Sequence, residues 1–115
     1  MAQNGKLPYD LLLATDPKLV KMELDLYWVT KAGRDPLELF KQHPGRFPLW
    51  HVKDMAKAAP YSFTEVGNGS IDFKRIFAHA NEAGLQYFFV EQDITPGSPF
   101  DSAAKSLAHI KKNLV

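Results

Sequence analysis

The sequence has no cysteine, no long apolar run and no excess of charge of one sign, and each absence excludes a class of protein. Without cysteine, neither disulfide bonds nor thiolate metal sites can form. The 14 basic and 13 acidic residues give a formal net charge of +1, which provides no electrostatic drive toward nucleic acid or an anionic membrane. No apolar run approaches the roughly 18 residues of a membrane span, and the opening residues lack the basic and apolar regions of a signal peptide. We therefore expect a cytoplasmic protein that binds neither nucleic acid nor membrane.

What the sequence does contain is enough apolar material for one core, with 45% apolar residues in a chain of 115. We therefore expect residues 1–115 to form a single domain. Stretches with helix signals separate three short apolar runs, which are Leu19–Asp25, Pro48–His51 and Gln86–Glu91. This order predicts alternating strands and helices, the pattern of an α/β fold with a parallel sheet.

Helix signals flank these runs. One helix is expected over residues 6–14, and another begins at Asp35, which can cap it. Phe73–Ala83 has helical spacing, and Ser98 opens the capping signature of a last helix. The mixed stretch Asp54–Asn68 is expected to be a long loop, a kind of connector that often serves as a functional lid.

Four further features have local interpretations. The third apolar run, QYFFVE, is the most hydrophobic, so we expect that strand to be buried on both faces. Trp50 points to the opposite face from His51 along its strand and is expected to pack beneath the helices. Trp28 can stack on a sugar ring. Gly67–Gly69 precedes a helix start and can either cradle a phosphate or form a plain turn.

Each strand run ends in a side chain that can bind a metal, namely Asp25, His51 and Glu91. Because the carboxyl ends of parallel strands meet at one edge of the sheet, we expect these side chains to converge there. Lys53 shares the face of His51 and can bind a substrate oxygen or phosphate, while Asp54 can orient either of them. Taken singly, Asp25 is also typical of a solvated or helix-capping acid, and His51 of a hydrogen-bonded core histidine. Glu91 follows an apolar run and is harder to explain as a surface acid.

Three segments, MELDLYW, PLWHVKDM followed by GNGSIDF, and FFVEQD, together resemble the last three βα units of the sugar-phosphate isomerase/epimerase family, the xylose-isomerase-like TIM barrels. The resemblance implies an α/β fold of parallel βα units that forms the C-terminal part, about three strands, of a (β/α)8 barrel. It implies that Asp25, His51 and Glu91 are three of the four ligands of a divalent metal (Mn²⁺, Mg²⁺, Co²⁺ or Zn²⁺), with Glu91 also transferring protons. The fourth ligand, a Glu, would lie on a strand before residue 1. Trp28 stands where many relatives carry a substrate-contacting His.

The implied function is that of a fragment of a metal-dependent sugar or sugar-phosphate isomerase/epimerase, which moves protons through a metal-stabilised enediolate. Trp28, Lys53 and Asp54 would bind the substrate. Because one Glu ligand is missing, we expect the chain to be inactive alone. Three strands cannot close a barrel, so we expect a homo-oligomer or the missing N-terminal part of the barrel to cover the open edges. The alternative is a non-catalytic α/β binding or self-assembling module with a vestigial metal site.

Overall fold

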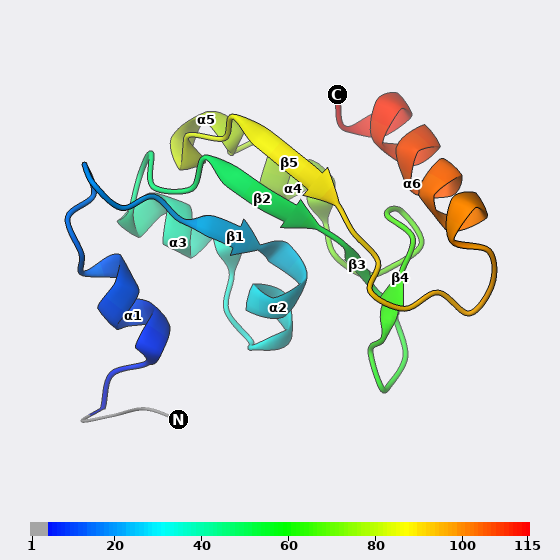
Figure 1. Ribbon diagram of the computed structural model, residues 1–115, viewed down its shortest axis with the longest axis horizontal. Helices are drawn as coiled ribbons and strands as arrows, with labels where there is room; N and C mark the ends of the chain where they lie inside the picture. The colour runs from blue at the N-terminus through cyan, green and yellow to red at the C-terminus, as the bar shows by residue number, and fades with distance from the viewer. Residues whose placement is uncertain (1–4) are drawn as a thin grey trace.

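In the computed structural model, which describes residues 5–115, three parallel strands form the central sheet (Figure 1). The strands are β1 (Glu23–Asp25), β2 (Leu49–Val52) and β5 (Tyr87–Val90). Their order is β1-β2-β5, so the second of them along the chain lies in the middle. Where β1 pairs with β2, Asp25 lies opposite His51. This arrangement confirms the predicted α/β fold with parallel strands.

The helices of the described chain connect and flank these strands, and none of them is long and apolar enough to cross a membrane. They are α1 (Pro8–Leu13), α2 (Leu26–Lys31), α3 (Pro36–Gln42), α4 (Phe73–Phe77), α5 (Ala80–Ala83) and α6 (Pro99–Asn113). Several begin at a polar side chain that accepts a hydrogen bond from a backbone N–H in the first turn. These caps are Asp25 for α2, Asp35 for α3, Asp72 for α4 and Ser98 for α6.

The hydrophobic core lies between one face of the sheet and the helices. Leu24, Trp50 and Val52 point to this face and are fully buried. Trp50 stacks on Phe40 of α3 with 5.1 Å between the ring centroids, which confirms the expected packing beneath the helices. Because side chains alternate along a strand, His51 points to the opposite face, which we call the open face.

The prediction that β5 is buried on both faces is wrong, and the reason lies in the open face. Phe88 packs edge-on against Phe77 of α4, with 5.0 Å between the ring centroids. Tyr87 and Phe89 point the other way and remain 67% and 49% exposed. The strand is therefore only partly covered on the Phe88 face and exposed on the other, because the described residues supply no second layer over β5.

Three local predictions also need correction. The first strand is shorter than expected, and Leu19 is 83% exposed. The expected helix over 73–83 is divided into α4 and α5, a break that lets Phe77 reach Trp50 while Ala83 packs in the core. The expected loop over 54–68 contains an antiparallel hairpin of β3 (Asp54–Met55) and β4 (Phe63–Thr64).

Glu65 connects the end of this hairpin to α6. Its carboxylate accepts hydrogen bonds from the Ser102 hydroxyl at 2.8 Å and from the Asn68 amide at 3.2 Å. Nearby, the backbone N–H of Val66 donates to the Ser106 hydroxyl at 3.0 Å. The backbone N–H of Glu65 itself, with the Ser102 hydroxyl and the Asn68 amide, lowers the pKa of Glu65 from 4.5 to about 2.

We expect Glu65→Gln to remove a pH-dependent part of the stability. Because the folded pKa lies below the unfolded value, the ionised carboxylate stabilises the folded protein above about pH 4.5 and loses that contribution as the pH falls toward 2. Urea midpoints measured over this range should therefore fall less steeply in the variant than in the wild type. Glu38→Gln, at an exposed position of α3, is the control. Parallel curves for wild type and Glu65→Gln would contradict the expectation.

Candidate functional site

The three side chains at the strand ends meet on the open face. Asp25 ends β1, His51 lies in β2 and Glu91 follows β5 directly. One potential ligand atom from each lies within 4.8 Å of the others. His51 Nδ1 is 3.5 Å from Asp25 Oδ2 and 3.1 Å from Glu91 Oε2. The predicted convergence at one rim is confirmed, and we call these residues the rim triad.

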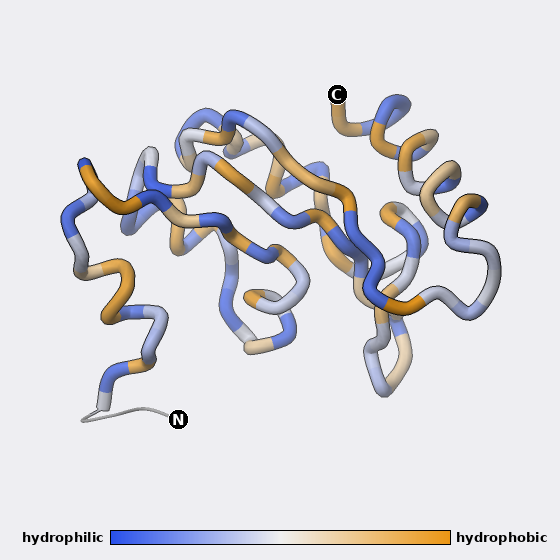
Figure 2. Tube along the Cα trace, in the orientation of Figure 1, coloured by the Kyte–Doolittle hydropathy of each residue, from blue (hydrophilic) through white to orange (hydrophobic). Residues whose placement is uncertain are grey.

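The rim lies where apolar strands give way to polar chain. Figure 2 shows the apolar colouring of β5 change to hydrophilic colouring just past the strand, where Glu91, Gln92 and Asp93 lie. The triad side chains are partly exposed, at 20% for Asp25, 30% for His51 and 36% for Glu91. A ligand from solvent can therefore reach them while the backbone beneath stays packed.

Lys53 places a buried ammonium group among the carboxylates of the rim. Its side chain is only 4% exposed, and Nζ lies 2.9 Å from Glu91, 3.1 Å from Asp25 and 3.3 Å from Asp93. Burial alone lowers the pKa of Lys53, but the carboxylates of Glu91, Asp25 and Asp93 together raise it above its ordinary value. Lys53 is therefore a fixed positive charge that bridges two members of the triad.

Glu23 is a rim residue that the sequence analysis did not single out. Its Oε1 lies 2.9 Å from His51 Nε2, on the side of the ring away from Asp25 and Glu91. A carboxylate at Nε2 favours the tautomer with its proton there, which leaves the Nδ1 lone pair directed at the other two triad members. The available signal was strand alternation, since Glu23 precedes Asp25 by two positions and shares its face.

Asp54 does not have the role expected of it. It is 1% exposed, and its two carboxylate oxygens accept backbone N–H groups from Met55 at 2.8 Å, Gly67 at 3.0 Å, Gly69 at 3.0 Å and Ile71 at 3.1 Å. These contacts occupy the carboxylate, so we reassign Asp54 from substrate contact to holding the loop over 67–71. They also engage the glycine N–H groups, which favours the plain-turn interpretation over a phosphate cradle.

No protein-family model matches the chain. It is similar to two inosose dehydratases, from Geobacillus thermodenitrificans (31% identity, covering 89% of this chain and 41% of the relative) and Lacticaseibacillus casei (29% identity, 87% and 40%). Two crystal structures of sugar phosphate isomerase/epimerase proteins from Parabacteroides distasonis also match. They have TM-scores of 0.77 and 0.74, identities of 30% and 31%, and cover 96% and 95% of this chain. Over nearly its whole length, the chain is therefore similar to part of proteins described as sugar phosphate isomerase/epimerase.

The family fold accounts for the open face. The chain spans about two fifths of the length of the relatives and structures it matches, which agrees with the predicted C-terminal part of a xylose-isomerase-like TIM barrel. In such a barrel, parallel strands close into a ring with one face inward and catalytic groups at their carboxyl ends. The open face of β1, β2 and β5 corresponds to that interior, and the rim triad lies at the carboxyl ends of the strands.

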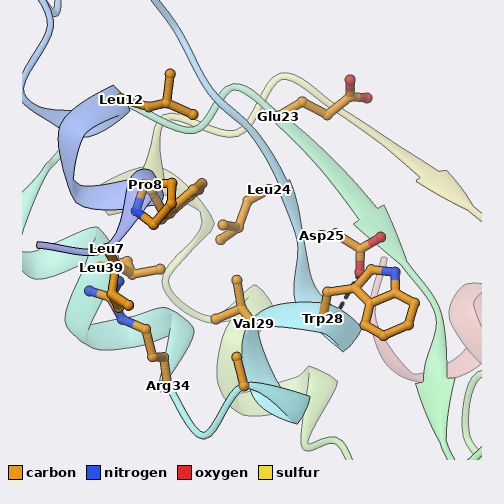
Figure 3. A pocket seen from close by; sticks show the side chains of 12 residues that line it. Leu7, Pro8, Leu12, Glu23, Leu24, Asp25, Trp28, Val29, Arg34 and Leu39 are labelled. Atoms are coloured by element: carbon orange, nitrogen blue, oxygen red, sulfur yellow. Dashed lines mark hydrogen bonds between the residues drawn. The ribbon is translucent and has the colours of Figure 1, made fainter. Parts of the chain in front are cut away.

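A hollow of about 520 Å³ lies along the outer edge of β1 (Figure 3). Leu24 and Val29 point into it toward α1, whereas Glu23 points away. At its rim end, the Asp25 carboxylate lies beside the Trp28 indole and accepts the backbone N–H of Trp28 at 3.0 Å. Asp25 is thus both a helix cap and a member of the rim triad, and the edge of β1 that pairs with no described strand leads directly to it.

Proposed function

We propose that this chain is part of a divalent-metal-dependent sugar isomerase or epimerase, in which Asp25, His51 and Glu91 hold the metal. The observation that carries the proposal is the rim triad, two carboxylates and an imidazole within ligand distance of one another at the strand ends of a chain similar to these proteins. This donor set suits Mn²⁺, Mg²⁺, Co²⁺ or Zn²⁺ without selecting one of them.

The substrate class follows from the chemistry that the names of the relatives share. Isomerising a sugar, inverting a carbinol beside a carbonyl and dehydrating an inosose can all begin with removal of a proton from a carbon next to a ketone or aldehyde. A divalent ion held by Asp25, His51 and Glu91 would supply Lewis-acid stabilisation for the negative charge that develops on the substrate oxygens. We therefore propose a polyhydroxy ketone or aldehyde, either free or phosphorylated.

In the proposed reaction, Glu91 takes the proton from carbon. Its Oε2 is held by the ammonium group of Lys53, with Nζ at 2.9 Å, and lies 3.1 Å from His51 Nδ1. Lys53 can exchange its longest contact, to the 46%-exposed Asp93 at 3.3 Å, for a substrate oxygen. In this way Lys53 would hold the substrate oxygen next to the carbon that Glu91 deprotonates.

We assign the fourth metal ligand, the family's remaining Glu, to a strand that pairs with the outer edge of β1. A preceding segment of the barrel or a second copy of the chain would supply that strand and fill the hollow beside β1. Among the described residues, the ammonium group of Lys53 supplies the positive charge between Asp25 and Glu91. The chain alone is therefore expected to bind metal weakly and to turn over substrate poorly.

The test is a titration of Mn²⁺ or Co²⁺ into the protein while the thermal unfolding midpoint is recorded. Saturation at a hundredfold excess over the dissociation constant corresponds to about 2.7 kcal/mol of stabilisation. We expect His51→Ala to abolish this gain and His79→Ala, a surface histidine paired with Glu82 at 3.1 Å, to retain it. Equal stabilisation of both variants would refute the metal site.

One observation favours a second candidate, a self-assembling module with a vestigial site. Tyr87 and Phe89 expose large apolar surfaces next to each other on the open face. Sedimentation analysis in the same titration separates the two candidates. A stable oligomer that is indifferent to metal supports the module, whereas metal-dependent stabilisation that requires His51 supports the enzyme.

A further inference from the structure

A second hollow, of about 490 Å³, lies next to the rim triad and is mostly aromatic and apolar in its lining. It is built from three segments that each follow the carboxyl end of a parallel strand, namely α2 after β1, the β3–β4 hairpin after β2, and the loop after β5. We call it the aromatic pocket. Its lining residues are Tyr27, Trp28, Lys31, Pro60, Ser62, Phe63, Ile94 and Pro96.

Three rings form a continuous aromatic wall. Tyr27 lies 4.7 Å from Phe63 and 5.0 Å from Trp28 between ring centroids, and Trp28 lies 5.9 Å from Phe63. Tyr27 is fully buried, whereas Trp28 is 49% exposed. The wall therefore presents the indole of Trp28 to solvent on a support of packed rings.

The wall is held in place before any ligand arrives. The Tyr27 hydroxyl donates to the Tyr61 carbonyl at 2.6 Å, which ties α2 to the β3–β4 hairpin. Tyr61 has φ of +58°, a left-handed conformation that costs energy for a residue with a side chain and persists only where its surroundings fix it. Such fixed geometry is typical of a binding wall rather than of a free loop.

The aromatic pocket adjoins the rim. The backbone N–H of Trp28 donates to Asp25 Oδ1, and Lys53 Nζ lies 5.8 Å from the centroid of the Phe63 ring. A molecule whose reacting carbon lies at Glu91 and Lys53 therefore reaches the aromatic pocket with its other end. The pocket faces that remote part of the substrate.

The charge of the aromatic pocket indicates the chemistry of the remote part of the substrate. Among residues 5–115, Lys31 is the one charged residue that lines the pocket, and no acid of that range lines it. Lys31 Nζ lies 5.2 Å and 5.3 Å from the ring centroids of Tyr27 and Trp28 and donates to the Tyr27 hydroxyl at 3.0 Å. The ammonium is thus already engaged with π faces and a hydroxyl. A phosphate needs several convergent donors, and the lining offers instead an apolar wall of rings set at angles to one another.

We propose that the aromatic pocket binds a second ring attached to the reacting sugar, so that the substrate is a glycoside rather than a phosphorylated monosaccharide. This inference rests on the proposed sugar chemistry at the rim. The apolar C–H face of the second ring lies on Trp28, and its hydroxyls point to solvent or to Ser62 and Lys31 at the pocket edge. The aromatic pocket thereby selects for a ring substituent and gives no advantage to a phosphate group.

Calorimetric titration of the 115-residue protein in EDTA tests this, with glucose, glucose 6-phosphate and the disaccharides cellobiose, maltose and trehalose as probes. We expect at least one disaccharide to bind about tenfold more tightly than glucose, and glucose 6-phosphate to bind no better than glucose. Trp28→Ala should abolish the disaccharide advantage, whereas Lys105→Met, at an exposed position of α6, should keep it. Lys31→Met tests whether any preference for glucose 6-phosphate depends on the ammonium group. Circular dichroism confirms that the variants are folded, and Phe63→Leu provides a second disruption of the wall.

Two results would overturn the inference. One is a Lys31-dependent preference for glucose 6-phosphate, which would make the pocket a phosphate site. The other is the absence of any disaccharide advantage, or an advantage that survives both Trp28→Ala and Phe63→Leu. Because these titrations contain no metal, their failure leaves the metal titration of the rim triad standing, and failure of the metal titration leaves the sugar preference measurable.

Discussion

Asp54→Ala is expected to destabilise the protein by about 3–5 kcal/mol, a large share of the roughly 5–15 kcal/mol that holds a domain of this size together. The variant removes a carboxylate that is 1% exposed and leaves the partly buried backbone N–H groups of Gly67, Gly69 and Ile71 without that acceptor. Denaturant unfolding followed by circular dichroism measures the loss. The loop over 67–71 and the start of α4 should be disturbed first, because Asp54 holds both of them to β3.

Two further variants test whether loss of the Asp54 carboxylate causes the loss of stability. Asp16→Ala removes an exposed carboxylate that accepts one backbone N–H, from Lys18 at 2.8 Å, and should cost no more than about 1 kcal/mol. Gly69→Ala keeps the carboxylate but brings a methyl group against Asp54 and the Met55 carbonyl, so it should destabilise by steric conflict. If Asp54→Ala unfolds at the same denaturant concentration as Asp16→Ala, the carboxylate does not organise this loop.

Lys53→Met is expected to destabilise the metal-free protein by about 2–3 kcal/mol and to make it more responsive to metal than the wild type. Without the ammonium group, the carboxylates of Asp25, Glu91 and Asp93 face one another with no positive charge between them. The estimate is at the low end for a buried charge because these carboxylates are 20%, 36% and 46% exposed and water screens part of the repulsion. A divalent ion would restore the missing charge.

The measurement compares unfolding free energies in EDTA and in saturating Mn²⁺. Lys105→Met, at an exposed position of α6, is the matched control and should behave as the wild type does. A Lys53→Met variant that is as stable as the wild type in EDTA would show that the ammonium group does not hold the rim. A variant that loses stability but gains nothing extra from Mn²⁺ would argue against a metal between these carboxylates.

Much of the rim could be predicted because it depends on simple periodicity. Parallel strands in register bring residues at equivalent positions side by side, so Asp25 and His51 follow from where their apolar runs end. The same alternation placed Lys53 on the face of His51 and Trp50 on the opposite, buried face. The helix caps at Asp35 and Ser98 could also be predicted, since each depends only on one side chain and the turn that follows it.

What could not be predicted depends on contacts between distant parts of the chain. The strands β3 and β4 are two residues each, too short to leave a periodic signal. The loop over 67–71 is held to β3 by Asp54 hydrogen bonds that span 13 to 17 residues. The contact between Glu23 and His51 depends on side-chain torsions. The exposure of Phe89 depends on what covers the open face, and that is a property of the assembled barrel rather than of the strand.

The strand order β1-β2-β5 also has a kinetic consequence. Both neighbours of β2 are distant in the chain, so neither pairing can form as a local hairpin, and each must first overcome the entropy of closing a long loop. Each of the three strands positions one member of the triad. A partly folded chain in which only one strand pairing has formed therefore brings together only two of the three members. A cation present during folding can therefore bind the complete triad only after both pairings have formed. It stabilises the late stage of folding and not the early stage.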